Sequence, residues 1–211
     1  MGQDIPVTDW DYAHNPYLIE FAEDMKYARD LFDIGLYHKR TSCIRKYGFA
    51  IPTYEAITAI DGCTVHPYAD NIVEIGAGSG YWAYLLRQFS RRIRAFDPAP
   101  GGSVRSPYSF WKSWTEVEKD DHTVLSRIPE AKSAVLLMVW PDYDVDWPAQ
   151  ALEAFPGNVF AYVGEGYYGC TGNERFHKIL ADQWKSVSQK WLPKWPGIHD
   201  GLEIYKRKMT S

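Results

Sequence analysis

Three glycines, spaced at every second position, follow a short apolar run that is typical of a buried strand. The run is residues 72–75, and the turn after it is Gly76-Ala77-Gly78-Ser79-Gly80. Glycine allows the backbone to turn sharply and allows a ligand to approach where a Cβ would block it. The carboxyl end of a strand and the amino end of the following helix both face such a ligand. The pattern therefore predicts a site for a nucleotide-type cofactor.

An acidic residue lies where such a site would use one. Asp97 follows Gly78 by 19 residues and comes directly after the next predicted strand. A carboxylate there can accept hydrogen bonds from both hydroxyls of a ribose. The spacing does not separate two classes of cofactor, since Gly78, Gly80 and Ala83 also satisfy the dinucleotide pattern G-x-G-x-x-A. An NAD-dependent oxidoreductase therefore stays open on spacing alone.

The elements that must position these residues alternate between strand and helix from residue 71 onward. We expect strands at 72–75, 93–96, 115–118, 134–139 and 159–163, and helices at 81–89, 149–155 and 174–184. The two strand-like runs at 186–191 and 202–208 are separated by a segment too short for a helix, so they should pair as an antiparallel hairpin. The predicted fold class is α/β, with a doubly wound, mainly parallel sheet that this C-terminal hairpin closes.

The first 70 residues have a different pattern. Asn15 is a capping residue followed by a proline, and apolar residues then recur at helical spacing, so we expect a helix over 16–34. A second helix is expected over 53–60, with Thr53 as its cap. We therefore expect a helical N-terminal cap (1–70) that belongs to the same domain as the cofactor-binding part (71–211).

The segment Glu74-x-Gly76-x-Gly78-x-Gly80 resembles the first motif of the class I S-adenosylmethionine-dependent methyltransferases. The expected antiparallel hairpin at the end of the sheet and the helices before the first strand are also similar to that family. The resemblance covers roughly residues 45–208 of the chain. It implies a Rossmann-like fold, S-adenosylmethionine as cofactor and methyltransferase activity.

The resemblance also implies roles for individual residues. Glu74 would reach toward the methionine amino group, directly or through water, and Asp97 would hold the ribose hydroxyls. An acid after the third strand usually meets the adenine amino group, which points to Asp120 or Asp121, with Asp120 as the candidate. The segment that begins at Tyr47 either crosses the cofactor or only packs Phe49 into the core. The remaining cofactor residues would be Gly76, Ala77, Gly78 and Gly80 of the loop, Pro98 beside the adenine, and Trp140 after the fourth strand.

The segment Trp140-Pro141-Asp142-Tyr143 would lie next to the cofactor. Family members that methylate exocyclic or amide nitrogens carry Asn or Asp, two prolines and an aromatic residue here. Trp140 stands at the polar position, and an indole can donate a hydrogen bond but cannot accept the proton of a target nitrogen. Asp142 or Asp144 is therefore the candidate to take the place of the polar residue, and the resemblance implies that the ring of Tyr143 stacks on the acceptor.

Two further residues could serve as a general base. Glu165 lies in the glycine-rich loop 164–172, at the edge of the sheet where ligands bind. His199 lies beside Asp200 in the hairpin connection, and histidine can act as a base near neutral pH. Each also has a structural interpretation, as part of a tight turn or as an exposed loop residue.

Composition limits the partners. The net charge of −4 gives no global attraction to nucleic acid, although nucleic acid stays open as an acceptor. Aromatic residues make up 16% of the chain, which favours a small or planar acceptor among them. Cys43, Cys63 and Cys170 have no metal-ligand spacing, so no metal is predicted. Neither a signal peptide nor a membrane span is expected, and we predict a cytoplasmic protein.

Two other functions compete with methyl transfer. Trp140 at the polar position raises the alternative of a protein that binds S-adenosylmethionine in a scaffold role without transferring its methyl group. The nicotinamide-dependent oxidoreductase rests only on the spacing of Gly78, Gly80 and Ala83.

Overall fold

The computed structural model describes residues 5–27, 34–64, 71–89, 92–101, 109–110 and 112–209. Its strands form one seven-stranded sheet in the order β3-β2-β1-β4-β5-β7-β6. The bounds are β1 Asn71–Ile75, β2 Ile93–Asp97, β3 Glu118–Lys119, β4 Ala134–Val139, β5 Val159–Gly164, β6 Trp184–Trp191 and β7 Gly201–Arg207.

The pairing in this sheet is parallel from β3 to β5. β2 pairs with β3 and with β1, and β4 pairs with β1 and with β5, all in parallel register. β7 is antiparallel to β5 on one side and to β6 on the other. The predicted fold class, a doubly wound and mainly parallel sheet closed by a C-terminal antiparallel hairpin, is confirmed.

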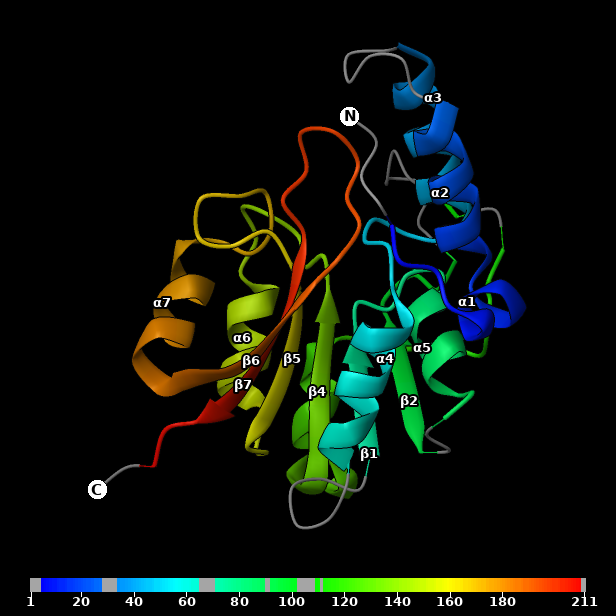
Figure 1. The fold of residues 1–211 in the computed structure, drawn as a ribbon. Coiled ribbons are helices and arrows are strands. Elements are labelled where there is room, and N and C mark those ends of the chain that lie inside the picture. Colours follow the sequence, from blue (N-terminus) through cyan, green and yellow to red (C-terminus); the bar gives the residue numbers. More distant parts are fainter. Residues whose placement is uncertain are drawn as a thin grey trace.

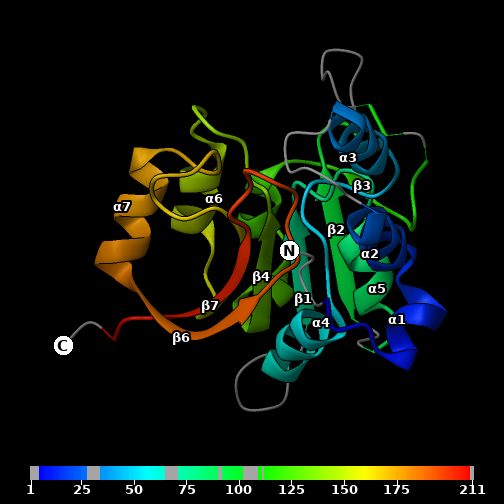
Figure 2. The same ribbon diagram turned by 45° about the horizontal axis from the view of Figure 1, so that its top comes forward.

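Helices cover both faces of the sheet (Figure 1). One face carries α4 (Tyr54–Asp61, followed by the 3₁₀ turn η1, Gly62–Thr64) and α5 (Tyr81–Leu86). The other carries α6 (Trp147–Ala154), α7 (Glu174–Gln183) and the 3₁₀ helices η2 (His122–Ser126) and η3 (Pro129–Ser133). The N-terminal helices α1 (Asp9–His14), α2 (Pro16–Tyr27) and α3 (Ile34–Lys46) gather beside β2 and α5, away from α6 and α7 (Figure 2).

The alternation of side chains along β1 decides where its single acid points. Ile72 packs into the core on the α5 face, whereas Val73 and Ile75 pack into the core on the α6 face. Because successive residues of a strand point to opposite faces, Glu74 points to the same face as Ile72. The acid before the glycine turn therefore lies under α5.

The structure adds a helix to the predicted elements and places the third strand differently. The predicted helix 16–34 begins as expected, α2 is described as far as Tyr27, and the rest of the predicted range, residues 28–33, lies outside the described part of the chain. The structure has a further helix, α3, where the sequence shows mainly polar and basic residues around Leu36, Cys43 and Ile44. The third strand is Glu118–Lys119 rather than 115–118.

None of the described helices combines the length and apolarity that crossing a bilayer requires.

A buried asparagine joins the N-terminal helices to the sheet domain. The Asn15 side chain donates to Asp11 Oδ1 at 3.0 Å and to the carbonyl oxygen of Pro52 at 2.9 Å. Its Oδ1 accepts the N–H of Leu18 at 3.3 Å and the hydroxyl of Tyr81, in α5, at 2.8 Å. The expected cap at the start of α2 is thus present, and the same side chain fixes α2 against α5.

Replacing Asn15 by alanine should cost more than replacing an ordinary helix cap. We expect Asn15→Ala to lower the free energy of unfolding by about 2–4 kcal/mol, because buried partners lose their hydrogen bonds. Asn173, which caps α7 by accepting the N–H of Phe176 at 2.9 Å, is the matched control. Asn173→Ala should cost about 1 kcal/mol. Urea denaturation measures both, and equal costs would contradict a linking role for Asn15.

Candidate functional site

A cavity of about 480 Å³ opens at the carboxyl ends of the central strands. Its lining comes from the segment 47–49, from residues 74–79 at and after the end of β1, from 97–99 at and after the end of β2 and from 121–122 at the start of η2. Val139, Trp140, Asp142 and Trp147 line it on the β4 side. The volume lies within the range of about 300–1,000 Å³ that is typical of small-molecule sites.

The glycine turn has the backbone conformation that the sequence predicts. Gly76, Gly78 and Gly80 have φ angles of 75°, 54° and 72°, all in the left-handed region that favours glycine. A Cβ on Gly78 would lie 2.7 Å from the ring of Phe110, and one on Gly76 would lie 3.0 Å from Trp147. Conformation and close packing both require glycine at these two positions.

Asp97 fixes this turn to the end of β2. Its Oδ2 accepts the N–H of Gly78 at 2.9 Å, and its Oδ1 accepts the N–H of Ala99 at 2.7 Å. A carboxylate has about four lone-pair positions, so each oxygen can accept a further hydrogen bond. Asp97, Pro98 and Ala99 all line the cavity, and Asp97 can therefore hold both the loop and a ligand hydroxyl.

Glu74 is a buried acid in the cavity lining whose hydrogen bonding is incomplete. The residue is 1% exposed, and its Oε2 has no hydrogen-bond partner among the described residues. Burial raises the pKa of Glu74 to about 8, against the opposing charge of Arg87, and the nearby Asp97 raises it further. A buried acceptor of this kind is costly alone and is stabilised by a cationic or N–H donor from a ligand. The side chain therefore fits the ammonium group of an amino acid.

Three side chains hold the segment around Tyr47 over the glycine turn. Ser79 Oγ donates to the carbonyl oxygen of Tyr47 at 2.6 Å, and Trp114 Nε1 donates to that of Lys46 at 2.6 Å. Trp82 Nε1 donates to the carbonyl oxygen of Ala50 at 3.3 Å. The segment is thereby attached to α5 and to the chain before β3, and Tyr47, Gly48 and Phe49 form one wall of the cavity.

Trp140 lines the cavity together with Phe49, and the two rings form an aromatic wall. Its indole lies parallel to the ring of Phe49, with centroids 4.8 Å apart and an interplanar angle of 9°. Its Nε1 donates to Asp200 Oδ1 at 2.6 Å.

The structure places the two acceptor candidates after Trp140 differently. Asp142 lines the cavity and accepts a hydrogen bond from Trp147 Nε1 at 2.9 Å. Tyr143 is 55% exposed and lies outside the lining.

The two further base candidates do not line the cavity. Glu165 is buried, and its two oxygens accept the backbone N–H groups of Cys170 and His199, each at 2.8 Å. The imidazole of His199 is exposed, with its Nδ1 3.6 Å from Glu165 Oε1. This geometry ties the loop after β5 to the β6–β7 connection, which is the structural interpretation of both residues.

The acid after the third strand is also placed differently from the expectation. Asp120 lies outside the cavity lining and forms an ion pair with Arg127 at 2.7 Å. Asp121, the next residue, lines the cavity and caps η2 through the N–H of Thr123. The third strand is short and displaced from the expected position, and the acid that follows it at the cavity is therefore Asp121.

Several lining residues were not found from the sequence. Phe110, His122 and Trp147 reach the cavity from segments without a recognisable motif. Ser79 lies inside the glycine motif, and its alternation with the glycines was the one available signal. The aromatic content of the chain indicated that some rings line a cleft, but not which ones.

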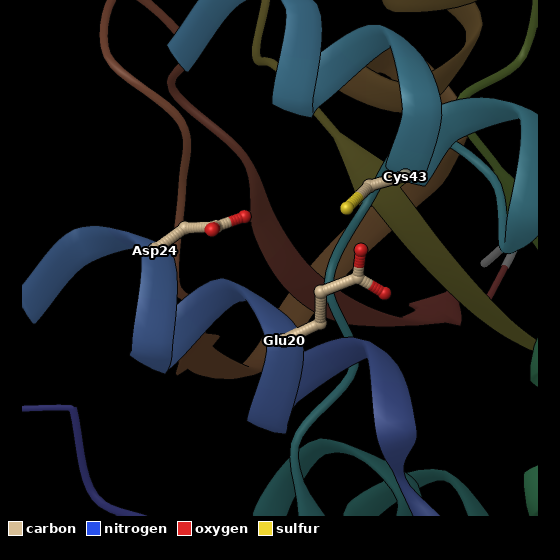
Figure 3. A group of neighbouring side chains, drawn as sticks. All are labelled: Glu20, Asp24 and Cys43. Atoms are coloured by element: carbon tan, nitrogen blue, oxygen red, sulfur yellow. The ribbon is translucent and has the colours of Figure 1, made fainter. Parts of the chain in front are cut away.

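One group of possible metal ligands lies away from the cavity. Glu20, Asp24 and Cys43 project toward one another between α2 and α3, with their ligand atoms within 4.8 Å (Figure 3). Lys46 Nζ lies 2.7 Å from Glu20, and Lys39 Nζ lies 2.9 Å from Asp24. The group therefore joins two helices through ion pairs.

Comparison with known proteins gives matches among solved structures alone. No family model matches the sequence, and no curated protein matches it. A 1,6-didemethyltoxoflavin-N1-methyltransferase from Burkholderia thailandensis is 15% identical, with 99% of this chain and 94% of that chain covered and a TM-score of 0.48. A magnesium protoporphyrin IX methyltransferase from Synechocystis PCC 6803 is 9% identical, with 94% and 97% covered and a TM-score of 0.48. The N-methyltransferase NodS from Bradyrhizobium japonicum WM9 is 14% identical, with 84% and 99% covered and a TM-score of 0.46. At these values the likeness assigns no role to any residue.

The buried acid makes a prediction about stability and pH. The pKa of Glu74 is raised from 4.5 to about 8 in the folded protein, so the folded state binds the proton more tightly than the unfolded state does. Its contribution to stability therefore falls as the pH rises from about 4.5 to about 8. We expect Glu74→Gln to gain stability over the wild type by about 2–4 kcal/mol between pH 5 and pH 8.

Denaturant unfolding at a series of pH values measures this difference. Glu23→Gln, at an exposed position on α2, is the control and should leave the pH dependence unchanged. A constant difference between Glu74→Gln and the wild type across this range would show that Glu74 ionises normally.

Proposed function

We propose that this chain is a class I S-adenosylmethionine-dependent methyltransferase. The observation that carries the proposal is the pairing of two different acids across one left-handed glycine turn. Glu74 presents a buried oxygen that has no hydrogen-bond partner in the described part of the chain, and Asp97 presents a carboxylate anchored to the turn itself. Both line the same cavity. An amino acid joined to a nucleoside offers an ammonium group and two ribose hydroxyls to such a pair.

Different residues of the cavity lining would bind the methionine, the ribose and the adenine of this ligand. Glu74 would bind the methionine ammonium, and the backbone of the loop 76–78 would lie against the methionine and ribose. Asp97 would accept the ribose hydroxyls, with Pro98 beside the adenine. Asp121 would accept from the adenine amino group in place of Asp120, because Asp121 is the acid that lines the cavity.

S-adenosylmethionine supplies a methyl group that is already activated on a sulfonium, and S-adenosylhomocysteine remains after transfer to a lone pair of the acceptor. The protein must therefore chiefly bring the acceptor into line and keep water away. Phe49 and Trp140 offer flat ring surfaces for this task. We infer a small or planar acceptor. Where it must lose a proton, Asp142 is the carboxylate in the lining on the β4 side.

Two alternatives differ from this function in measurable ways. A protein that binds S-adenosylmethionine without transferring its methyl group would keep the cofactor affinity but would produce no S-adenosylhomocysteine with any acceptor. A nicotinamide-dependent oxidoreductase would be stabilised by NAD instead. Thermal unfolding with NAD and with S-adenosylhomocysteine, compared side by side, should show stabilisation by S-adenosylhomocysteine alone.

Asp97 provides the sharpest test of cofactor binding. We expect Asp97→Ala to weaken S-adenosylhomocysteine binding by about 100-fold or more, because hydrogen bonds to a charged group contribute about 1.5–3 kcal/mol each. Isothermal titration calorimetry measures the affinity. Asp120→Ala is the matched control, since Asp120 lies outside the lining, and it should bind as the wild type does. Absence of binding to the wild-type protein would refute the proposal.

Binding should also release protons near neutral pH. The pKa of Glu74 is about 8 before a ligand cation arrives, and a cation beside the carboxylate favours its ionised form. Titrations at pH 7 in buffers of different ionisation enthalpy should therefore show release of about one proton at most per ligand. Glu74→Gln should abolish most of this release, and an unchanged release would place its source elsewhere.

Methyl transfer itself requires an acceptor screen. Labelled S-adenosylmethionine is incubated with planar small molecules, nucleosides, amino acids, nucleic acids and proteins, and S-adenosylhomocysteine is quantified. We expect acceptor-dependent production with at least one planar compound. Cofactor binding without production across the whole screen would favour the binding-only alternative.

A further inference from the structure

The backbone of Trp140 has a conformation that a bulky residue rarely adopts. Its φ is 51°, in the left-handed region, directly after the last residue of β4. For a non-glycine residue with a large side chain this is an outlier that the surroundings must maintain. The backbone N–H of Trp140 donates to the carbonyl oxygen of Val163 at 2.8 Å, which continues the pairing of β4 with β5. The backbone therefore turns sharply at Trp140, while the end of β4 remains paired with β5.

Two contacts hold the side chain of Trp140. One is the parallel stack on Phe49, and the other is the bond from Nε1 to Asp200 Oδ1 at 2.6 Å. An indole has a single donor and no acceptor, so this bond uses all of its hydrogen-bonding capacity. The surface that Trp140 gives to the cavity is consequently ring carbon.

Asp200 is itself held in place by the β6–β7 connection. It is 3% exposed and lies directly before β7. The adjacent His199 donates its backbone N–H to the buried Glu165 at 2.8 Å. Earlier in the connection, Trp195 donates its indole N–H to the hydroxyl of Tyr17 at 3.2 Å. The connection thus presents the carboxylate to Trp140 from a fixed backbone.

We propose that Asp200 is a positioning residue, which accepts the indole N–H of Trp140 and thereby keeps that ring flat on Phe49 as the aromatic wall of the cavity. The role of this wall in holding a planar acceptor rests on the proposed function, whereas the positioning itself does not. The β6–β7 connection, which is far from the glycine motif in sequence, then determines the shape of the part of the cavity that would hold the methyl acceptor.

The charge of Asp200 makes this bond sensitive to pH. Burial raises the pKa of Asp200 to about 7, and the nearby Glu165 raises it further, while the hydrogen bond from Trp140 and the charges of Arg40 and Lys194 oppose the shift. Near neutral pH the acceptor therefore changes from a neutral acid to a carboxylate, and a charge-assisted hydrogen bond is the stronger one. The side chains whose charge or hydrogen bonding acts on Asp200 are Tyr17, Arg40, Tyr162, Glu165, Lys194 and the indole of Trp140.

The test uses the indole N–H signals of the ligand-free, full-length protein labelled with ¹⁵N-tryptophan. The Trp140 signal is the one that is lost in Trp140→Phe. In the wild type we expect it to move downfield as the pH rises, with a midpoint near the pKa of about 7. Trp114, which donates to the carbonyl oxygen of Lys46, is the matched internal control, and its signal should not titrate in this range.

Two variants at position 200 separate charge from geometry. Asp200→Asn keeps an acceptor oxygen without the charge, so the Trp140 signal should stay in the bonded range and should no longer titrate. Asp200→Ala removes the acceptor, so the signal should move upfield and its exchange with water should be about tenfold faster or more. If Asp200→Ala does not fold, Asp200→Asn and the wild-type titration still decide the question.

A Trp140 signal that is the same in Asp200→Ala as in the wild type, or that titrates equally in Asp200→Asn, would overturn the proposal. Affinity for S-adenosylhomocysteine is then measured on the same proteins. We expect Asp200→Asn to bind within about twofold of the wild type and Asp200→Ala to bind about three- to tenfold more weakly. If the wild type does not bind this ligand, the proposed function fails while the signals still decide the role of Asp200.

Discussion

The arrangement of this site depends on the free-energy cost of burying the carboxyl group of Glu74, near the end of β1. Glu74 lies under α5 with an oxygen that no described residue satisfies, and Asp97 lies close enough to raise its pKa. Two acids at one cavity are unfavourable until a cation or a hydrogen-bond donor reaches them. The turn between the two acids consists largely of glycines with left-handed φ angles, so its backbone carries few side chains that could fill the cavity. Glu74 therefore lowers the stability of the ligand-free protein, and a cationic ligand would offset that cost.

The parts of this arrangement that depend on neighbouring residues could be predicted from the sequence. β4 has the predicted bounds because a continuous apolar run between polar turns leaves little choice. The glycine turn could be predicted because its conformation is a property of the glycines themselves. The hairpin followed from the length of the connection, since ten residues rich in proline and glycine cannot form a crossover helix.

The parts that depend on distant contacts could not be predicted. α3 has few apolar residues, and its basic residues reach acids of α2, as Lys46 does with Glu20, so its inner face is partly polar. Asp121 rather than Asp120 lines the cavity, just after the two-residue strand β3. The hydrophobic pattern of the sequence cannot locate so short a strand. Glu165 and His199 have residue types suited to catalysis, but only tertiary structure shows that backbone N–H groups occupy Glu165.

The position of β7 has a consequence for the order in which the molecule assembles. β7 follows β6 in the chain yet lies between β6 and β5, so β6 has no partner in the sheet until β7 has been synthesised. A ribosome that has completed β6 therefore holds a chain with an open sheet edge. Asp200, which immediately precedes β7, reaches Trp140 at the same late stage. The bond that holds Trp140 in the cavity wall and the pairing of the last strands are thus completed at the same stage of synthesis.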